Sequence, residues 1–194
     1  MHKLTRADLM SLEQYASERG RLRGEVIAHK RLRNVPVGPH MTWCFEDRTT
    51  IRYQILEMLR AERIFESDGI QGELDAYNPL VPDGNNWKVT LLLEFPDAEQ
   101  RRVALGELIG VEDRCWMQVG EMDRIFAIAD EDLKRENDEK TSAVHFLRFE
   151  ATPSMIQAMK GNATLSVGVD HEHYRHSVSP LSAPTRDALR ADLV

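Results

Sequence analysis

One carboxylate stands on what the sequence predicts to be the apolar face of a helix. Residues 48–66 have the clearest helical periodicity, and at about 100° per residue Glu62 falls near the middle of an apolar stripe. The other members of that stripe are Ile51, Ile55, Met58, Leu59 and Phe65. A buried carboxylate must be paired, protonated or bound to a metal ion, because an unpaired buried charge is strongly destabilising. We therefore expect Glu62 to contact an arginine, a histidine or a metal ion. The candidate histidines are His29, His145 and His171.

His145 lies in a stretch whose residues alternate as in a β-strand. Within residues 143–149 it shares one face with Leu147 and Phe149. A histidine on an apolar strand face is either a core residue with satisfied hydrogen bonds or a metal ligand or proton shuttle, since neutral imidazole is the commonest metal ligand in proteins. The sequence leaves both interpretations open.

A histidine-rich segment follows the last predicted strand, at residues 169–176. In an extended chain His171 and His173 share a face, whereas in a helix His173 and His176 share one, so one conformation does not bring all three together. With Asp170, the segment offers two or three nitrogen and oxygen ligands of the kind that suits iron, zinc or manganese. The alternative is a polar surface loop.

A basic segment, residues 19–33, could bind an anion, RNA or an acidic partner such as an acidic redox protein. Its cations are Arg19, Arg21, Arg23, Lys30, Arg31 and Arg33. The acidic run at residues 130–139 belongs to the same chain, so an internally paired or solvated helix is the alternative. His29 lies inside this segment and is a weaker member of any metal site.

The elements that must position these side chains are predicted to form an α+β domain. Residues 1–78 read as mainly helical, residues 87–170 as rich in strands, and residues 184–193 as a C-terminal helix. Strands outnumber crossover helices in the second half, and a hairpin is expected around residues 120–123. This favours a mainly antiparallel sheet packed against the N-terminal and flanking helices, with residues 1–194 as a single domain.

The loop at residues 78–87 is long and rich in turn-forming residues. It places the polar side chains of Asp83, Asn85 and Asn86 beside the aromatic Trp87, as the walls of ligand sites often do. It therefore supports an alternative function, that of a small-molecule enzyme with a pocket beside this loop.

Composition excludes several classes of function. The net charge of −7 argues against a general nucleic-acid binder, and the apolar runs are too short for a membrane span. Two cysteines, Cys44 and Cys115, and the absence of an export signal lead us to expect a cytoplasmic protein with reduced thiols. Phosphate-loop, dinucleotide, serine-hydrolase and zincin motifs are absent from the sequence. The oligomeric state is not predicted.

Several longer motifs together resemble those of an uncharacterised bacterial family, domain of unknown function 3501, and the resemblance extends over nearly the whole chain. They are Val26-Ile27-Ala28-His29-Lys30, Phe45-Glu46-Asp47-Arg48, residues 51–60, residues 73–80, Pro82-Asp83-Gly84-Asn85-Asn86-Trp87, Asp130-Glu131-Asp132-Leu133, residues 140–147 and Gly168-Val169-Asp170-His171. The resemblance brings no established reaction and no catalytic residue. It implies a link to iron or peroxide stress, because genes of this family tend to lie near those of rubrerythrin-like and iron–sulfur proteins.

The resulting prediction is a metal-binding accessory factor in iron or peroxide-stress metabolism, with Glu62, His145, His171, His173 and His29 as candidate ligands of iron, zinc or manganese. The alternatives are the small-molecule enzyme and a non-catalytic adaptor that docks an acidic redox partner.

Overall fold

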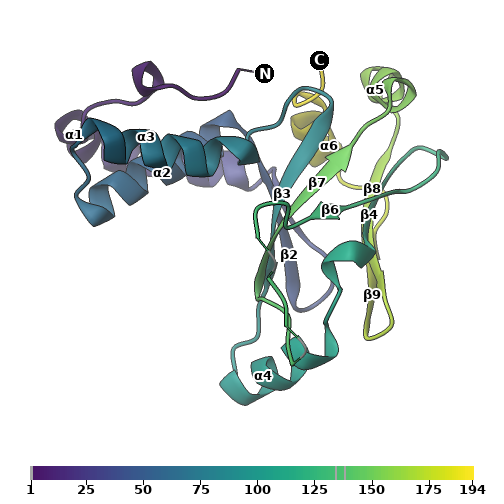
Figure 1. Ribbon diagram of the computed structural model, residues 1–194. Helices are drawn as coiled ribbons and strands as arrows, with labels where there is room; N and C mark the ends of the chain where they lie inside the picture. Colours follow the sequence, from purple (N-terminus) through teal and green to yellow (C-terminus); the bar gives the residue numbers. More distant parts are fainter. Residues whose placement is uncertain (1, 134, 138) are drawn as a thin grey trace.

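The computed structural model describes residues 2–133, 135–137 and 139–194, and its N-terminal part is mainly helical. A 3-10 turn and three helices form this part: η1 (Arg6–Asp8), α1 (Leu12–Lys30), α2 (Arg48–Glu62) and α3 (Ser67–Tyr77). Helix α1 begins after Ser11 and α2 after Asp47, and each of these side chains accepts backbone N–H groups of the first turn. Figure 1 shows the three helices grouped on one side of the sheets.

Two antiparallel sheets make up the rest of the fold, together with short helices. The first sheet has the order β1–β2–β3–β7–β6, and the second β5–β4–β8–β9. The first comprises β1 (Asn34–Pro36), β2 (Met41–Glu46), β3 (Asn86–Leu93), β7 (Val144–Glu150) and β6 (Ile128–Ala129), and the second β5 (Ile125–Phe126), β4 (Cys115–Val119), β8 (Leu165–His171) and β9 (Tyr174–Val178). The connections contain η2 (Asn78–Leu80), α4 (Ala98–Glu107), η3 (Glu112–Arg114), α5 (Pro153–Lys160) and α6 (Ala183–Arg190).

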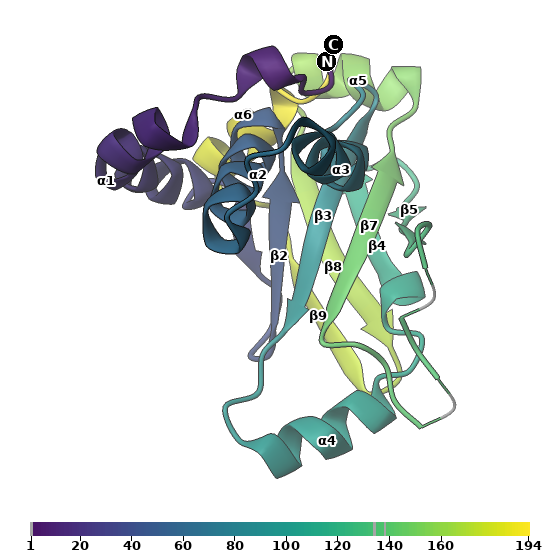
Figure 2. The same cartoon turned by 60° about the vertical axis from the view of Figure 1, so that its left-hand side comes forward.

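The main hydrophobic core includes inward-facing residues of both sheets, such as Trp43, Trp87, Phe149 and Val167. A second, smaller core lies among the helices, where Ile51, Ile55 and Leu59 of α2 pack with residues of α3 and the N-terminus. Figure 2 shows α2 and α3 in front of the first sheet and β8 and β9 behind it. The predicted α+β class with antiparallel pairing is confirmed.

Two details differ from the sequence prediction. The histidine-rich segment is not simply a loop past the last strand, because β8 continues to His171 and a further strand, β9, follows a short turn. The C-terminal helix α6 ends at Arg190, earlier than expected. In the part of the chain that the structure describes, no helix combines the length and the apolar character needed to cross a bilayer.

The prediction that Glu62 faces the core is wrong. Glu62 is the last residue of α2 and is exposed. The buried stripe of α2 ends one turn earlier, at Leu59, and Phe65, which the same stripe was expected to include, is 60% exposed. The helix extends beyond the small core on which it packs, so its periodicity continues where there is nothing left to bury it.

Candidate metal centre

Two carboxylates and one imidazole, which come from separate elements, converge in the interior between η3, β6 and β7. Glu112, Asp130 and His145 each offer one ligand atom, and these atoms all lie within 4.8 Å of one another. Across the described ranges 2–133, 135–137 and 139–194, this is the one group of three such side chains close enough to hold a metal ion. His145, a predicted candidate, is therefore the centre of a cluster.

The strand register explains how Asp130 reaches His145. In β7, alternation turns His145 and Leu147 into the core, whereas Phe146 and Arg148 point to the other face. Asp130 follows β6 directly and pairs with Phe146: its backbone N–H donates to the Phe146 carbonyl (2.9 Å), and its Oδ1 accepts the Phe146 N–H (2.9 Å). Its φ of 47° lies in the left-handed region, which Asp tolerates better than most residues. Asp130 is thus fixed at both its backbone and its carboxylate.

His145 is fully buried, and both of its ring nitrogens have partners. Nε2 lies 3.1 Å from the Ser142 carbonyl and 2.9 Å from Oγ1 of Thr141, while Nδ1 lies 2.6 Å from Oδ2 of Asp130. Because a carbonyl can only accept, this geometry assigns a hydrogen to Nε2. Nδ1 then faces carboxylate oxygens and needs a positive species, either a proton or a metal ion, on that side.

Glu112 is the least satisfied member of the cluster. Its Oε1 lies 3.8 Å from Nδ1 of His145, and its Oε2 is buried without a hydrogen-bond partner among the described residues. Burial raises the pKa of this carboxyl group above its ordinary value. The one arginine in contact with the cluster, among described residues, is Arg135, which lies 3.4 Å from Oδ1 of Asp130 and is bound mainly by Asp132.

Thr141, His145 and Asp130 are arranged as in a catalytic triad of hydroxyl, imidazole and carboxylate. The Thr141 hydroxyl lies next to Nε2 of His145, and Asp130 lies next to Nδ1. A catalytic triad must present its hydroxyl to a substrate. Thr141 is only 2% exposed and His145 is fully buried, so the hydroxyl is not accessible from solvent. The arrangement is better suited to holding an ion than to attacking a substrate.

The other predicted ligands lie elsewhere and do not join the cluster. Nε2 of His29 lies 2.6 Å from Oδ2 of Asp47 in a separate cluster near α1 and α2. His171 is buried with both nitrogens engaged, because Nε2 contacts the Ile109 carbonyl (3.1 Å) and Nδ1 accepts the His173 backbone N–H (3.2 Å). His171 is therefore a satisfied structural residue of the β8–β9 hairpin.

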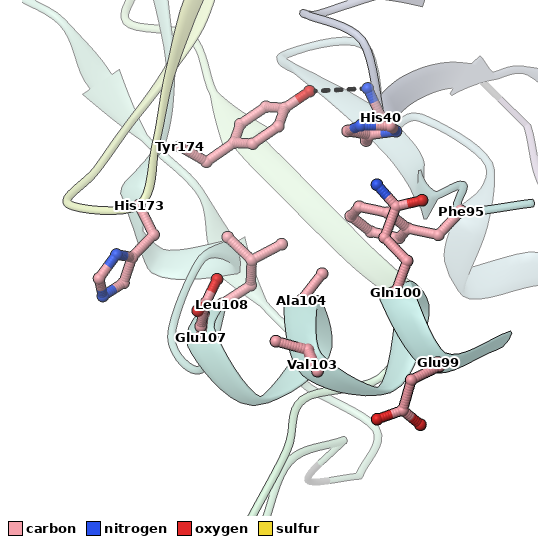
Figure 3. A pocket seen from close by; sticks show the side chains of 10 residues that line it. All are labelled: His40, Phe95, Glu99, Gln100, Val103, Ala104, Glu107, Leu108, His173 and Tyr174. Carbon is pink, nitrogen blue, oxygen red and sulfur yellow. Dashed lines mark hydrogen bonds between the residues drawn. The ribbon is translucent and has the colours of Figure 1, made fainter. Parts of the chain in front are cut away.

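His173 lies at a cavity of about 440 Å³ between α4 and the β8–β9 hairpin. In Figure 3, His40 stacks on Phe95 on one side of this cavity and His173 lies on the opposite side, on the hairpin. The hydroxyl of Tyr174 accepts the backbone N–H of His40 and donates to the Val37 carbonyl. The two histidines do not converge, so the cavity is not a metal centre.

Sequence reasoning missed Glu112 and Asp130. Asp130 opens the acidic run, which the sequence presents only as a source of partners for the basic segment, and Glu112 belongs to a single 3-10 turn with no periodicity to reveal its burial. A positive φ at Asp130 could not be read from the sequence either. Asp138 of the acidic run lies outside the described residues.

Comparisons with known proteins place the chain in a defined group. The model of a family described as "Protein of unknown function (DUF3501)" matches residues 3–193. No curated protein matches. A crystal structure at 1.90 Å resolution, described as a novel protein of unknown function from Burkholderia pseudomallei K96243, is similar with 51% identity and a TM-score of 0.95 over 100% of both chains.

Proposed function

The chain belongs to the DUF3501 family, and we propose that it is a metal-binding protein in which Glu112, Asp130 and His145 hold one divalent ion. The observation that carries this proposal is the buried Oε2 of Glu112, which has no hydrogen-bond partner among the described residues. Buried polar atoms are normally satisfied, so an orphaned carboxylate oxygen beside a second carboxylate and an imidazole indicates a cation that completes the cluster.

The donor set suits a particular class of ion. One imidazole nitrogen and two carboxylates are ligands for iron, zinc or manganese, while a thiolate site would favour softer ions. The Ser142 carbonyl supports this assignment, because a metal-bound histidine almost always donates its other ring N–H to a carbonyl, carboxylate or water. The ion would supply the positive charge that Nδ1 and the two carboxylates require.

The burial of the cluster supports an accessory role rather than turnover at the ion. His145 is fully buried and Glu112 is 6% exposed, so a substrate has no direct approach. We place this protein, as part of the proposal, in the cytoplasm and in iron or peroxide-stress metabolism, alongside rubrerythrin-like and iron–sulfur proteins. The family resemblance supports that context.

Elemental analysis of the tag-free full chain tests the proposal. The protein is stripped with a chelator, reconstituted separately with Fe²⁺ (without oxygen), Zn²⁺ and Mn²⁺, and desalted before measurement. We expect about one equivalent of at least one ion in the wild type and less than a tenth of that in His145→Gln, since one of three ligands is lost.

His29→Gln is the matched control, because His29 is also bonded to an aspartate at 2.6 Å but lies outside the cluster. It should bind as much metal as the wild type. Wild-type protein that retains none of the three ions, or equal losses in His145→Gln and His29→Gln, would rule out the proposed site. Circular dichroism verifies that both variants are folded.

A second candidate function is favoured by a specific observation: a cavity of about 280 Å³ lies beside the 78–87 loop. Its walls include Tyr77, Pro79 and Leu80 on one side and Phe146 of β7 on the other. A largely apolar cavity with a few charged groups is the usual form of a small-molecule site, so we propose small-molecule binding there.

The adaptor hypothesis has weaker support. Three of the cations in the basic segment are engaged within the chain: Arg19 by Glu57, Arg21 by Glu18 and Glu25, and Arg33 by Asp192. The surface left for an acidic redox partner therefore carries less positive charge than the sequence indicates.

A further inference from the structure

The cavity beside the 78–87 loop lies between α3 and η2 on one side and the outer face of β3 and β7 on the other. Figure 2 shows α3 in front of these two strands. Tyr77, Leu80 and Phe146 provide aromatic and aliphatic walls. Four charged residues also line it: Lys88, Glu131, Asp132 and Arg148.

Three of these four charges are already paired. Glu131 receives two hydrogen bonds from Arg148, at 2.7 and 2.8 Å, and Arg148 also binds Glu150. Asp132 accepts from Arg135 at 2.6 Å. Each of these three side chains therefore already has a partner of opposite charge.

Lys88 is different. Its side chain is only 12% exposed, and the one acidic oxygen within 4 Å of its Nζ, among described residues, belongs to Asp83 at 3.9 Å. Asp83 is held more closely by Lys3, at 2.7 Å, and by Asn86, at 3.0 Å. An ammonium group has three hydrogens to donate, and in the described part of the chain that of Lys88 makes no hydrogen bond. Burial also lowers the pKa of this group.

The strand register places Lys88 where a ligand in the cavity would meet it. Lys88 is opposite Arg148 in the β3–β7 pair, on the same face as Phe146. The ammonium therefore lies next to apolar walls, and the neighbouring guanidinium, already bound by two carboxylates, does not compete for a new anion.

We propose that this cavity binds a small organic monocarboxylate, with its carboxylate on Nζ of Lys88 and its apolar body against Tyr77, Leu80 and Phe146. The inference rests on the second candidate function, small-molecule binding at this cavity, and names the chemical class of the ligand. It does not depend on the metal centre, because none of Glu112, Asp130 and His145 lines the cavity.

A matched set of probes tests it on the full chain: hexanoate, hexan-1-ol, hexylamine and phenylacetate, titrated into ¹⁵N-labelled protein and followed by NMR. We expect hexanoate and phenylacetate to shift the amide signals of Leu80, Lys88 and Phe146 and to bind about tenfold more tightly than hexan-1-ol, as one charge-assisted hydrogen bond provides. Hexylamine should bind more weakly than the alcohol.

Two variants assign the effect to the ammonium. Lys88→Met keeps the length of the side chain and should make hexanoate no better a ligand than hexan-1-ol, whereas Lys88→Arg should retain the preference. Equal binding of hexanoate and hexan-1-ol by the wild type overturns the inference but leaves small-molecule binding standing. If none of the four probes binds, both fail. The wild-type comparison decides even if Lys88→Met does not fold.

Discussion

Two clusters in this molecule each join a histidine to an aspartate beside a second carboxylate, although His145 is fully buried and the His29 side chain is 35% exposed. In one, His145 meets Asp130 and Glu112; in the other, His29 meets Asp47, and Asp192 lies close by. The histidine–aspartate distance is 2.6 Å in both. The clusters differ most in where an arginine lies, since Arg135 only touches the first at Asp130 (3.4 Å) and is bound mainly by Asp132. Arg33, which is 2% exposed, lies at the centre of the second, with Nη2 2.5 Å from Asp192 and Nε 3.5 Å from Asp47.

That arginine is bound by the backbone as well. Its guanidinium donates to the carbonyl groups of Phe45, Glu46 and Ala188, so its hydrogen-bonding capacity is largely used. A permanent cation thus completes the second cluster, which joins β2 and α2 to the C-terminal α6. The first cluster has no cation in its interior among the described residues, and an oxygen of Glu112 stays unsatisfied. Similar sets of side chains therefore support different roles, a structural one for the second cluster and the proposed metal binding for the first.

The largest expected effect on stability comes from removing the Arg33 guanidinium from the second cluster. Arg33→Met should lower the free energy of unfolding by about 3–5 kcal/mol, because it leaves the buried Asp192 without its cationic partner and Asp47 with only His29 as an ionic partner. Urea denaturation measures this. Arg33→Met combined with Asp192→Asn should recover part of the loss, since it removes one of the stranded charges. A loss below about 1 kcal/mol in the single variant would mean that the cation is dispensable and that the comparison fails.

The proposed metal centre should behave in the opposite way. In metal-free protein, Glu112→Gln should change the free energy of unfolding by less than about 1 kcal/mol, because the orphaned oxygen makes no hydrogen bond to lose. With metal at a hundredfold excess over Kd, the wild type should gain about 2.7 kcal/mol and the variant almost nothing. Thermal unfolding with and without the ion measures both. A metal-induced gain of equal size in both proteins would exclude Glu112 as a ligand.

The contrast also shows what the sequence could and could not reveal. His145 was identified because alternation along a strand reports burial directly, and the antiparallel α+β fold followed from the same periodicity. Glu112 and Asp130 belong to irregular backbone, where no period exists, and their burial depends on which elements fold over them. Glu62 was assigned to the core because helical phase does not report where the neighbouring core ends.

A further carboxylate outside both clusters, Glu57, tests what a partly exposed ion pair contributes to stability. Its carboxylate accepts two hydrogen bonds from Arg19, at 2.7 and 2.8 Å, and one from the Tyr15 hydroxyl. Arg19 and Tyr15 lower the pKa of Glu57 to about 2. A pKa lower in the folded than in the unfolded state stabilises the protein above the unfolded value of 4.5, and this stabilisation is lost as the pH falls towards 2. Glu57→Gln should therefore cost about 1–2 kcal/mol at neutral pH, reduced by solvent screening because the side chain is 22% exposed.

Urea denaturation of wild type and Glu57→Gln between pH 7 and pH 3 checks this prediction. The difference should be constant at neutral pH and should narrow below pH 4.5. A difference that does not depend on pH would show that packing around Tyr15, rather than charge, accounts for the effect.

The smallest expected effect concerns Thr141, which contacts His145 on the side away from the proposed metal ion. Thr141 is buried, and its Oγ1 lies 2.9 Å from Nε2 of His145, but the Ser142 carbonyl lies near the same nitrogen at 3.1 Å. Thr141→Val keeps the shape of the side chain and removes one of these two acceptors, so it should lower the free energy of unfolding by about 1 kcal/mol. Because the carbonyl still holds the Nε2 hydrogen, metal affinity should fall by no more than about tenfold.

Thr141→Ser, which keeps the hydroxyl, should bind metal as the wild type does. Complete loss of metal in Thr141→Val would instead mean that the hydroxyl alone orients His145, and the tautomer assigned from the carbonyl would be wrong.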